Sequence, residues 1–166
     1  PAHDFVFGFE ESYGYLAGTH ARDKDAVVTA MLICEMAAYF KSLGKTLSDV
    51  LAELYETYGY YYDKSLSYTL KGLEGGRRIA AIMEEARSLD MKSVIPETVE
   101  TLDFEKGIGG LPRENVLKYR LAGGGWFAIR PSGTEPKIKF YYSLRGRNEE
   151  EALRLFGAYR SRLEKQ

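Results

Sequence analysis

The sequence predicts the tail of a layered α/β domain followed by a small α+β domain, whose antiparallel sheet is flanked by two helices. Three observations support this fold class. An apolar strand and two helices precede Gly59, the hydrophobic period then changes from helical to alternating, and short strands lie between two further helices. We therefore expect one part over residues 1–58 and a second part over residues 59–166.

The first part begins with "FVFGF", residues 5–9, which is typical of a short buried strand. The stretch "EESYGYLAGTHARDKD" that follows is polar and contains glycine, so we expect a loop. A long helix is predicted from about Asp25 to Leu43, with Gly44 as its C-terminal signal. Apolar residues lie nearly all round this helix, so it should be mostly buried. Thr46 then begins a second helix, with Asp49 three residues later as a variant of the capping box.

The second part begins with "YYYDKSLSYTLK", in which apolar and polar side chains alternate. That alternation predicts a half-exposed strand of an antiparallel sheet. Three glycines at 123–125 predict a tight turn between two strands, and Asn148 with Glu151 predicts the start of the last helix. The remaining strands are expected at about 98–104, 115–121, 125–130 and 137–143, and the helix before them contains Ile79, Ile82, Met83, Ala86 and Leu89.

Composition limits the classes of function. Of the 166 residues, 45% are hydrophobic and 28% charged, which is typical of a soluble globular protein with enough apolar material for a core. The net charge is −1, so we expect neither a nucleic-acid partner nor attachment to an anionic membrane.

Location and completeness are also predicted from the sequence. No signal peptide or membrane span is predicted, which favours a cytoplasmic location. The single cysteine, Cys34, excludes a disulfide within the chain and is interpreted as a buried structural thiol. Because the chain begins at Pro1 as if inside a domain, we expect a piece of a longer protein.

The stretch "AIRPSGTEPKIK", residues 128–139, is rich in groups that bind anions. An arginine fork can hold two phosphate oxygens, hydroxyls add donors, and a glycine lets the backbone turn so that N–H groups face one anion. No Walker loop is present, and a plain β-turn with surface charges is the alternative interpretation. The predicted phosphate-binding residues are Arg130, Ser132, Gly133, Thr134 and Lys139.

A second polar loop supplies candidates for sugar binding. Glu10 and Ser12 are two residues apart after the first strand, so their side chains share a direction if the backbone stays extended. A carboxylate and a hydroxyl aimed at one place suit vicinal sugar hydroxyls, and "HARDKD" adds Lys24 nearby. The alternative is that Asp23 and Asp25 cap the long helix and the rest is solvated loop. His20 has no partner spacing typical of a metal ligand, so no metal site is predicted.

Three motifs together, "FVFGFEESYGYL", "HARDKDAV" and "AIRPSGTEPKIKFYYS", resemble the C-terminal part of the α-D-phosphohexomutases, the phosphoglucomutase/phosphomannomutase enzymes. The resemblance covers the whole chain, as the end of the third domain plus a TATA-box-binding-protein-like fourth domain. It implies that Glu10 and Ser12 contact sugar hydroxyls and that the loop from Arg130 to Thr134 holds the phosphate that is not reacting. Lys24 and Lys139 match family positions more loosely.

The resemblance also implies what this chain lacks. The family's phosphoserine loop and its acidic Mg²⁺ loop are not in the sequence, so no catalytic residue or metal ligand is assigned here. The parent enzyme would interconvert hexose 1- and 6-phosphates through a hexose 1,6-bisphosphate, with Mg²⁺ and the phosphoserine supplied by its N-terminal domains. A non-catalytic phosphosugar-binding module is the alternative. Base stacking on the tyrosines of "YGYYYD" is a third interpretation, which the net charge disfavours.

Overall fold

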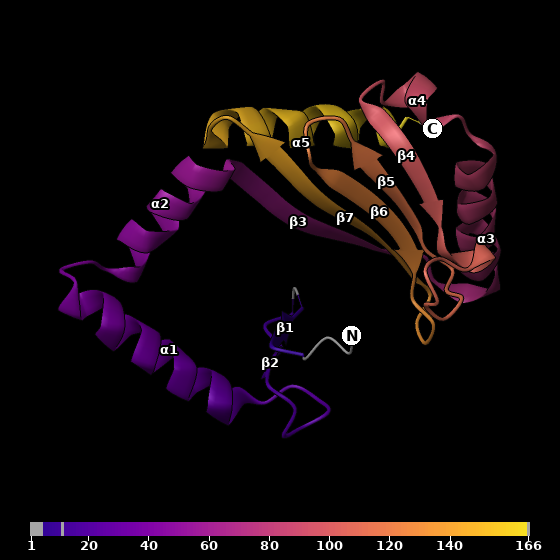
Figure 1. Cartoon of the computed structure of the whole chain (residues 1–166). Helices are drawn as coiled ribbons and strands as arrows, with labels where there is room; N and C mark the ends of the chain where they lie inside the picture. Colours follow the sequence, from indigo (N-terminus) through magenta and orange to yellow (C-terminus); the bar gives the residue numbers. More distant parts are fainter. Residues whose placement is uncertain (1–4, 11, 166) are drawn as a thin grey trace. The chain divides into compact units, whose positions relative to one another are not determined.

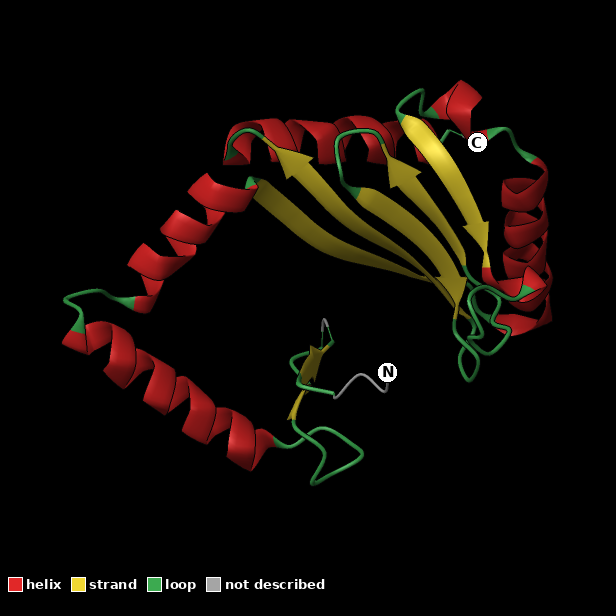
Figure 2. Cartoon of the chain, viewed as in Figure 1, coloured by secondary structure: helices red, strands yellow, loops and turns green. Residues whose placement is uncertain are grey.

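The computed structural model describes residues 5–10 and 12–165, without the side chain of Leu73. The chain divides into two compact units, Pro1–Thr57 and Tyr58–Gln166 (Figure 1). The fold class predicted from the sequence is confirmed by the helices and the antiparallel sheet of these units (Figure 2).

The first unit contains a small sheet and two helices. Strands β1 (Phe7–Phe9) and β2 (Tyr15–Ala17) pair antiparallel, and helices α1 (Ala26–Ser42) and α2 (Leu47–Tyr58) follow. The predicted capping box is present before α2. Thr46 N donates to Asp49 Oδ2 at 2.7 Å, and Asp49 N donates to Thr46 Oγ1 at 3.2 Å. Both bonds satisfy backbone donors that the first helical turn leaves unpaired.

Burial in the first unit was predicted wrongly. Helix α1 has no buried residue, Phe7 and Phe9 of β1 are exposed, and Cys34 is exposed as well. Helix α1 packs mainly on β2, a strand of three residues that is too short to cover a helix with apolar side chains all round. Strand β2 was itself predicted as loop, because its residues lie in a polar stretch with glycines.

Among the described residues, no single helix is long and apolar enough to cross a membrane. Helices α1 and α2 reach that length and composition only as a pair, and the pair is bent by 85° at its junction.

The second unit is built on a five-stranded antiparallel sheet with strand order β3-β7-β6-β5-β4. Its first strand pairs along its whole length with β7, from Tyr60 opposite Gly146 to Thr69 opposite Lys137. The strands are β3 (Tyr60–Thr69), β4 (Thr98–Asp103), β5 (Leu117–Leu121), β6 (Trp126–Pro131) and β7 (Lys137–Gly146). The helices are α3 (Gly72–Ser88), α4 (Met91–Val94), the 3₁₀ turn η1 (Phe104–Lys106) and α5 (Glu149–Leu163).

One face of this sheet carries the core, and helices α3 and α5 cover it (Figure 1). Tyr119, Phe127 and Tyr142 lie side by side on neighbouring strands, with ring centroids 4.6 Å and 6.4 Å apart. The Tyr142 ring meets Phe156 of α5, and the Tyr119 hydroxyl donates to the Ala86 carbonyl of α3 at 3.1 Å. Because side chains alternate along a strand, their sequence neighbours occupy the opposite face, here called the open face.

Candidate functional site

The predicted phosphate loop is the connection between β6 and β7. Ser132 N donates to the Lys137 carbonyl at 2.8 Å and closes the loop. The Ser132 hydroxyl oxygen accepts from the N–H of Thr134 at 3.5 Å and of Glu135 at 3.3 Å. A serine hydroxyl has two acceptor lone pairs and one donor, so its O–H remains available to a ligand oxygen.

Arg130 stands at the end of β6, directly opposite Lys139 of β7. Its side chain is exposed, and no carboxylate of the described residues lies within 4.0 Å of the guanidinium. Lys137 differs, because its ammonium is 3.0 Å from Glu135 Oε1 and its charge is therefore partly compensated. The fork of Arg130 and the O–H of Ser132 thus flank one loop and can donate to one oxyanion.

Gly133 was predicted to let the backbone turn tightly around an anion. Its backbone is outside the left-handed region, and an added Cβ would meet no atom within 4 Å. The turn therefore does not require glycine at this position. The space that a side chain at Gly133 would occupy is open.

The candidate sugar loop lies in the tight turn between β1 and β2. Glu10 N donates to the Gly14 carbonyl at 2.9 Å, and Tyr13 adopts a left-handed φ of 64°. Strand β1 ends at Phe9 and Ser12 is already in the turn. Neither Glu10 nor Ser12 therefore belongs to the strand on which their shared direction was predicted. Glu11 lies outside the described residues.

The structure brings Glu10 and Lys24 together. Lys24 Nζ is 3.8 Å from Glu10 Oε1 and 2.9 Å from Asp23 Oδ1, which raises the pKa of Lys24, mainly through Asp23. Gly14 makes this contact possible, since a Cβ there would come within 2.6 Å of Glu10 Oε1 and of Lys24 Cγ. A carboxylate acceptor and an ammonium donor are therefore presented side by side at this turn.

The helix-capping alternative is confirmed for one of its two aspartates. Asp25 Oδ1 accepts from the N–H of Val27 at 2.9 Å and of Val28 at 3.1 Å, while Asp23 binds Lys24. His20 Nε2 lies 2.9 Å from Asp25 Oδ2, and this contact lowers the pKa of Asp25. Over the described residues, no group of three or more His, Cys, Asp or Glu side chains could hold a metal ion.

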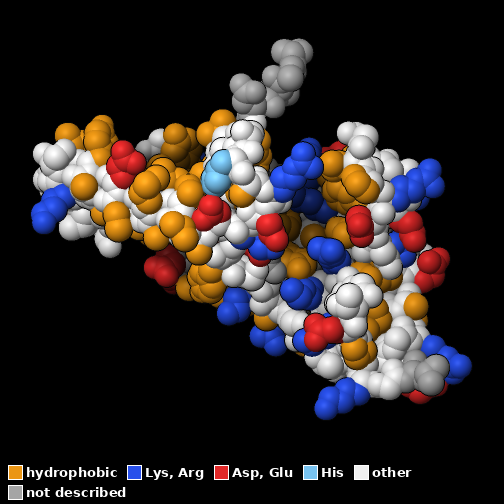
Figure 3. Space-filling view, turned by 90° about the horizontal axis from the view of Figure 1, so that it is seen from below, with side chains coloured by type: hydrophobic (Ala, Val, Ile, Leu, Met, Phe, Trp, Pro, Cys, Tyr) orange, Lys and Arg blue, Asp and Glu red, His pale blue; other side chains and the backbone are white. Residues whose placement is uncertain are grey.

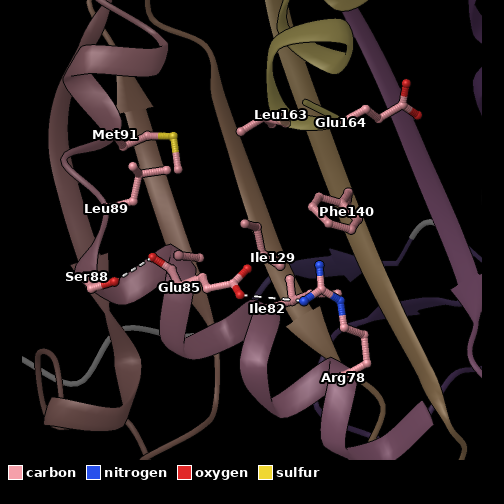
Figure 4. Close-up of a pocket in the computed structure, with 11 residues that line it drawn as sticks. Arg78, Ile82, Glu85, Ser88, Leu89, Met91, Ile129, Phe140, Leu163 and Glu164 are labelled. Atoms are coloured by element: carbon pink, nitrogen blue, oxygen red, sulfur yellow. Dashed lines mark hydrogen bonds and ion pairs between the residues drawn. The ribbon is translucent and has the colours of Figure 1, made fainter. Parts of the chain in front are cut away.

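A cavity of about 510 Å³ lies on the other face of the sheet, between α3, α5 and the strands (Figure 4). Its walls are mainly apolar, with Ile129 and Phe140 from the sheet and Leu163 from α5. At its edge Arg78 Nη1 is 3.5 Å from Glu85 Oε1. No residue of the two candidate loops lines this cavity.

Sequence reasoning missed two residues of the open face. Lys118 Nζ lies 4.1 Å from the ring centroid of Trp126, and both belong to the face that carries Arg130. Alternation along β5 and β6 could have placed them there, but the pairing of the two strands was needed to bring them together.

Comparisons with known proteins identify relatives for both units. A family model described as phosphoglucomutase/phosphomannomutase, alpha/beta/alpha domain III, matches residues 1–58. The model for the C-terminal domain of the same enzymes matches residues 77–157. A phosphoglucomutase of Staphylococcus haemolyticus is 41% identical over 160 residues, which cover 89% of this chain and 29% of the relative. A Staphylococcus aureus phosphoglucomutase is 40% identical over 167 residues, which cover 93% of this chain and 30% of the relative.

The chain thus spans about 30% of the length of the curated relatives that it matches. Among solved structures, the open form of the exocytosis-sensitive phosphoprotein pp63/parafusin, a phosphoglucomutase from Paramecium, is similar in fold, with a TM-score of 0.67. That match covers 93% of this chain and 29% of the other at 12% sequence identity.

Proposed function

The chain belongs to the phosphoglucomutase/phosphomannomutase family, and on this premise we propose that it forms the substrate-binding C-terminal part of a hexose phosphate mutase. The parent enzyme would interconvert hexose 1-phosphate and hexose 6-phosphate. The observation that carries the proposal is the β6–β7 loop, where the Arg130 side chain is exposed and the O–H of Ser132 is available to a ligand.

In the proposed complex the loop holds the phosphate that is not being transferred. Arg130 binds two of its oxygens, and Ser132 and Thr134 donate hydroxyl hydrogen bonds. Gly133 leaves the space that the phosphate needs, and Lys139 adds positive charge from the neighbouring strand. These contacts are made to the phosphate and not to the sugar, so they would serve both orientations of the substrate. The mutase reaction requires both, because the sugar phosphate turns round between the two phosphoryl transfers.

The turn after β1 is proposed to bind the sugar hydroxyls. Glu10 accepts from them, Lys24 donates to them, and Ser12 can do either. The pairing of Lys24 with Glu10 and Asp23 keeps the ammonium beside the carboxylate before substrate arrives. This arrangement suits glucose or mannose phosphates alike, since both offer neighbouring hydroxyls.

The chemical step is assigned to other parts of the parent protein. The described residues include no cluster of side chains that could hold a metal ion, so Mg²⁺, which the family uses generally, would be bound elsewhere in the parent protein. The phosphoserine would also belong to another part of that protein. A hexose 1,6-bisphosphate intermediate and a cytoplasmic location belong to the same proposal. The role of this chain would be to position a substrate for N-terminal domains of the parent.

Calorimetric titration of the chain with glucose 1-phosphate tests the proposal. We expect Arg130→Ala to weaken binding by about 10- to 100-fold, because hydrogen bonds to a charged group contribute roughly 1.5–3 kcal/mol. Arg154→Ala is the matched control, since Arg154 is an exposed arginine of α5, far in sequence from the loop. The same two variants and Glu10→Ala should then be assayed for kcat/KM in the protein expressed from its whole reading frame. Unchanged kcat/KM in Arg130→Ala and Glu10→Ala would refute the proposal.

A further inference from the structure

The proposed phosphate loop carries a carboxylate of its own, that of Glu135. A carboxylate near a bound phosphate repels it, so its presence in such a loop needs a physical reason. The backbone of Glu135 has a structural role, because its N–H donates to the Ser132 hydroxyl at 3.3 Å. Any residue other than proline at this position could make that bond, so the bond does not account for the carboxylate.

The Glu135 carboxylate contacts the ammonium of Lys137. Lys137 Nζ lies 3.0 Å from Glu135 Oε1, which is within hydrogen-bond distance. The side chain of Lys137 is 32% exposed and that of Glu135 is 56% exposed, so the ion pair lies at the surface, where such pairs are weak. A ligand that presents negative oxygens to Lys137 can therefore displace the carboxylate.

Lys137 lies next to the two groups that the proposed function assigns to the phosphate. Ser132 N donates to the Lys137 carbonyl at 2.8 Å, which places these residues opposite each other at the base of the loop. Arg130 is opposite Lys139 and is therefore a diagonal neighbour of Lys137, which is two residues earlier on β7. Residues two apart on a strand share a face, and diagonal neighbours are about 7–8 Å apart, within reach of long side chains. Lys137 can thus reach an oxyanion that Arg130 and Ser132 hold.

Arg130 and Lys137 differ in how their charges are compensated. On the side of the molecule that Figure 3 shows, acidic side chains lie among the Lys and Arg side chains. At the loop, Arg130 has no carboxylate of the described residues within 4.0 Å, whereas Lys137 has that of Glu135. Arg130 is therefore available to a ligand at once, and Lys137 becomes available only when its ion pair opens.

We propose that Glu135 limits the affinity of the loop for phosphate by holding Lys137, so that a bound phosphate competes with the carboxylate for this ammonium. This inference rests on the proposed function, in which the loop holds the phosphate that is not being transferred. A mutase must release that phosphate when its substrate turns round, and weaker binding speeds release. Glu135 is a positioning residue in this proposal, because it acts on the ligand through Lys137.

Calorimetric titration of the 166-residue chain with glucose 1-phosphate and with inorganic phosphate tests this inference. We expect Glu135→Gln to bind both ligands about three- to tenfold more tightly than the wild type, because it frees Lys137 and removes a negative charge. Glu135→Asp keeps the carboxylate and should stay within about twofold of the wild type. Glu149→Gln is the matched control, since Glu149 is an exposed glutamate at the start of α5, beyond the other end of β7.

A double substitution separates the ion pair from simple repulsion between Glu135 and the phosphate. If Glu135 acts through Lys137, Glu135→Gln should tighten binding by at most about twofold in a Lys137→Met background. If Glu135 only repels the phosphate, the effect of Glu135→Gln would be the same with and without Lys137, and the role of the ion pair would be overturned. A thermal melt of each variant without phosphate checks that it is folded.

The titrations also distinguish failure of this inference from failure of the proposed function. Binding that Arg130→Ala weakens and Glu135→Gln leaves unchanged would overturn the role of Glu135 and keep the proposed function. Binding that Arg130→Ala leaves unchanged would refute the proposed function itself. If neither the wild type nor Glu135→Gln binds glucose 1-phosphate, both proposals fail for this chain.

Discussion

At the scale of single residues, two adjacent glycines of α3 offer a matched test of the packing. A Cβ on Gly75 would overlap the Leu70 carbonyl, whereas a Cβ on Gly76 would meet nothing within 4 Å. We expect Gly75→Ala to lower the free energy of unfolding by about 1–3 kcal/mol through overpacking. Gly76→Ala should raise it by about 0.5–1 kcal/mol, because alanine is the better helix former. Urea unfolding measures both, and equal effects would show that α3 does not approach Leu70 as described.

The identity of the candidate site residues could be predicted from residue type, but their positions in space could not. Arg130 and Ser132 were identified because a fork of donors and a hydroxyl next to a glycine suit a phosphate. The position of Ser12 was not predictable, since the extended backbone ends at Phe9 and a turn follows. The contact of Lys118 with Trp126 was missed because it depends on the pairing of β5 with β6, which a single sequence does not specify.

At the scale of elements, the hydrogen bonds at the start of α5 were predicted in part from the sequence and affect stability in acid. Asn148 Oδ1 accepts from Glu151 N at 2.9 Å, as the sequence predicted. Glu151 Oε2 accepts from Arg147 N at 2.8 Å and from Arg147 Nε at 3.0 Å. These bonds, led by the one from the Arg147 side chain, lower the pKa of Glu151 to about 2.

The lowered pKa of Glu151 predicts that the protein loses stability in acid, and that Glu151→Gln abolishes this part of the pH dependence. A carboxyl whose pKa is lowered on folding stabilises the fold above its unfolded pKa, about 4.5, and this contribution disappears as the pH falls toward 2. We therefore expect the melting temperature of Glu151→Gln to be lower than that of the wild type at pH 7 and to converge with it near pH 2. Glu150→Gln, in the same helical turn, is the control and should follow the wild type throughout. A constant difference between Glu151→Gln and the wild type from pH 7 to pH 2 would contradict this assignment.

Helix prediction succeeded where the cap residues and the apolar period agree, as they do in α5 and α2. It failed for the burial of α1, whose many apolar residues pack mainly on a strand of three residues, β2. A hydrophobic pattern predicts that a surface will be covered. It does not identify which element covers it, because that depends on partners distant in sequence or in another part of a protein.

At the scale of the whole molecule, the two units differ in how much of their apolar surface is buried. In the described part of the chain, every buried residue belongs to Tyr58–Gln166, whose core joins α3, α4, α5 and the sheet. The first unit leaves large side chains exposed, among them Val27 at 81% and Phe9 at 75%. The driving force for cooperative folding therefore resides in the second unit.

We expect residues 58–166, expressed alone, to unfold in urea in one cooperative transition with the midpoint of the 166-residue chain. The reason is that the core and all five strands of its sheet lie within this segment. Residues 1–57 alone should show no cooperative transition, because none of their described side chains is buried. Circular dichroism and tyrosine fluorescence followed together provide the measurement, since coincident curves indicate a two-state process. A midpoint well below that of the longer chain would mean that the sheet needs the first unit for its stability, and the phosphate loop would then have to be tested only in the longer chain.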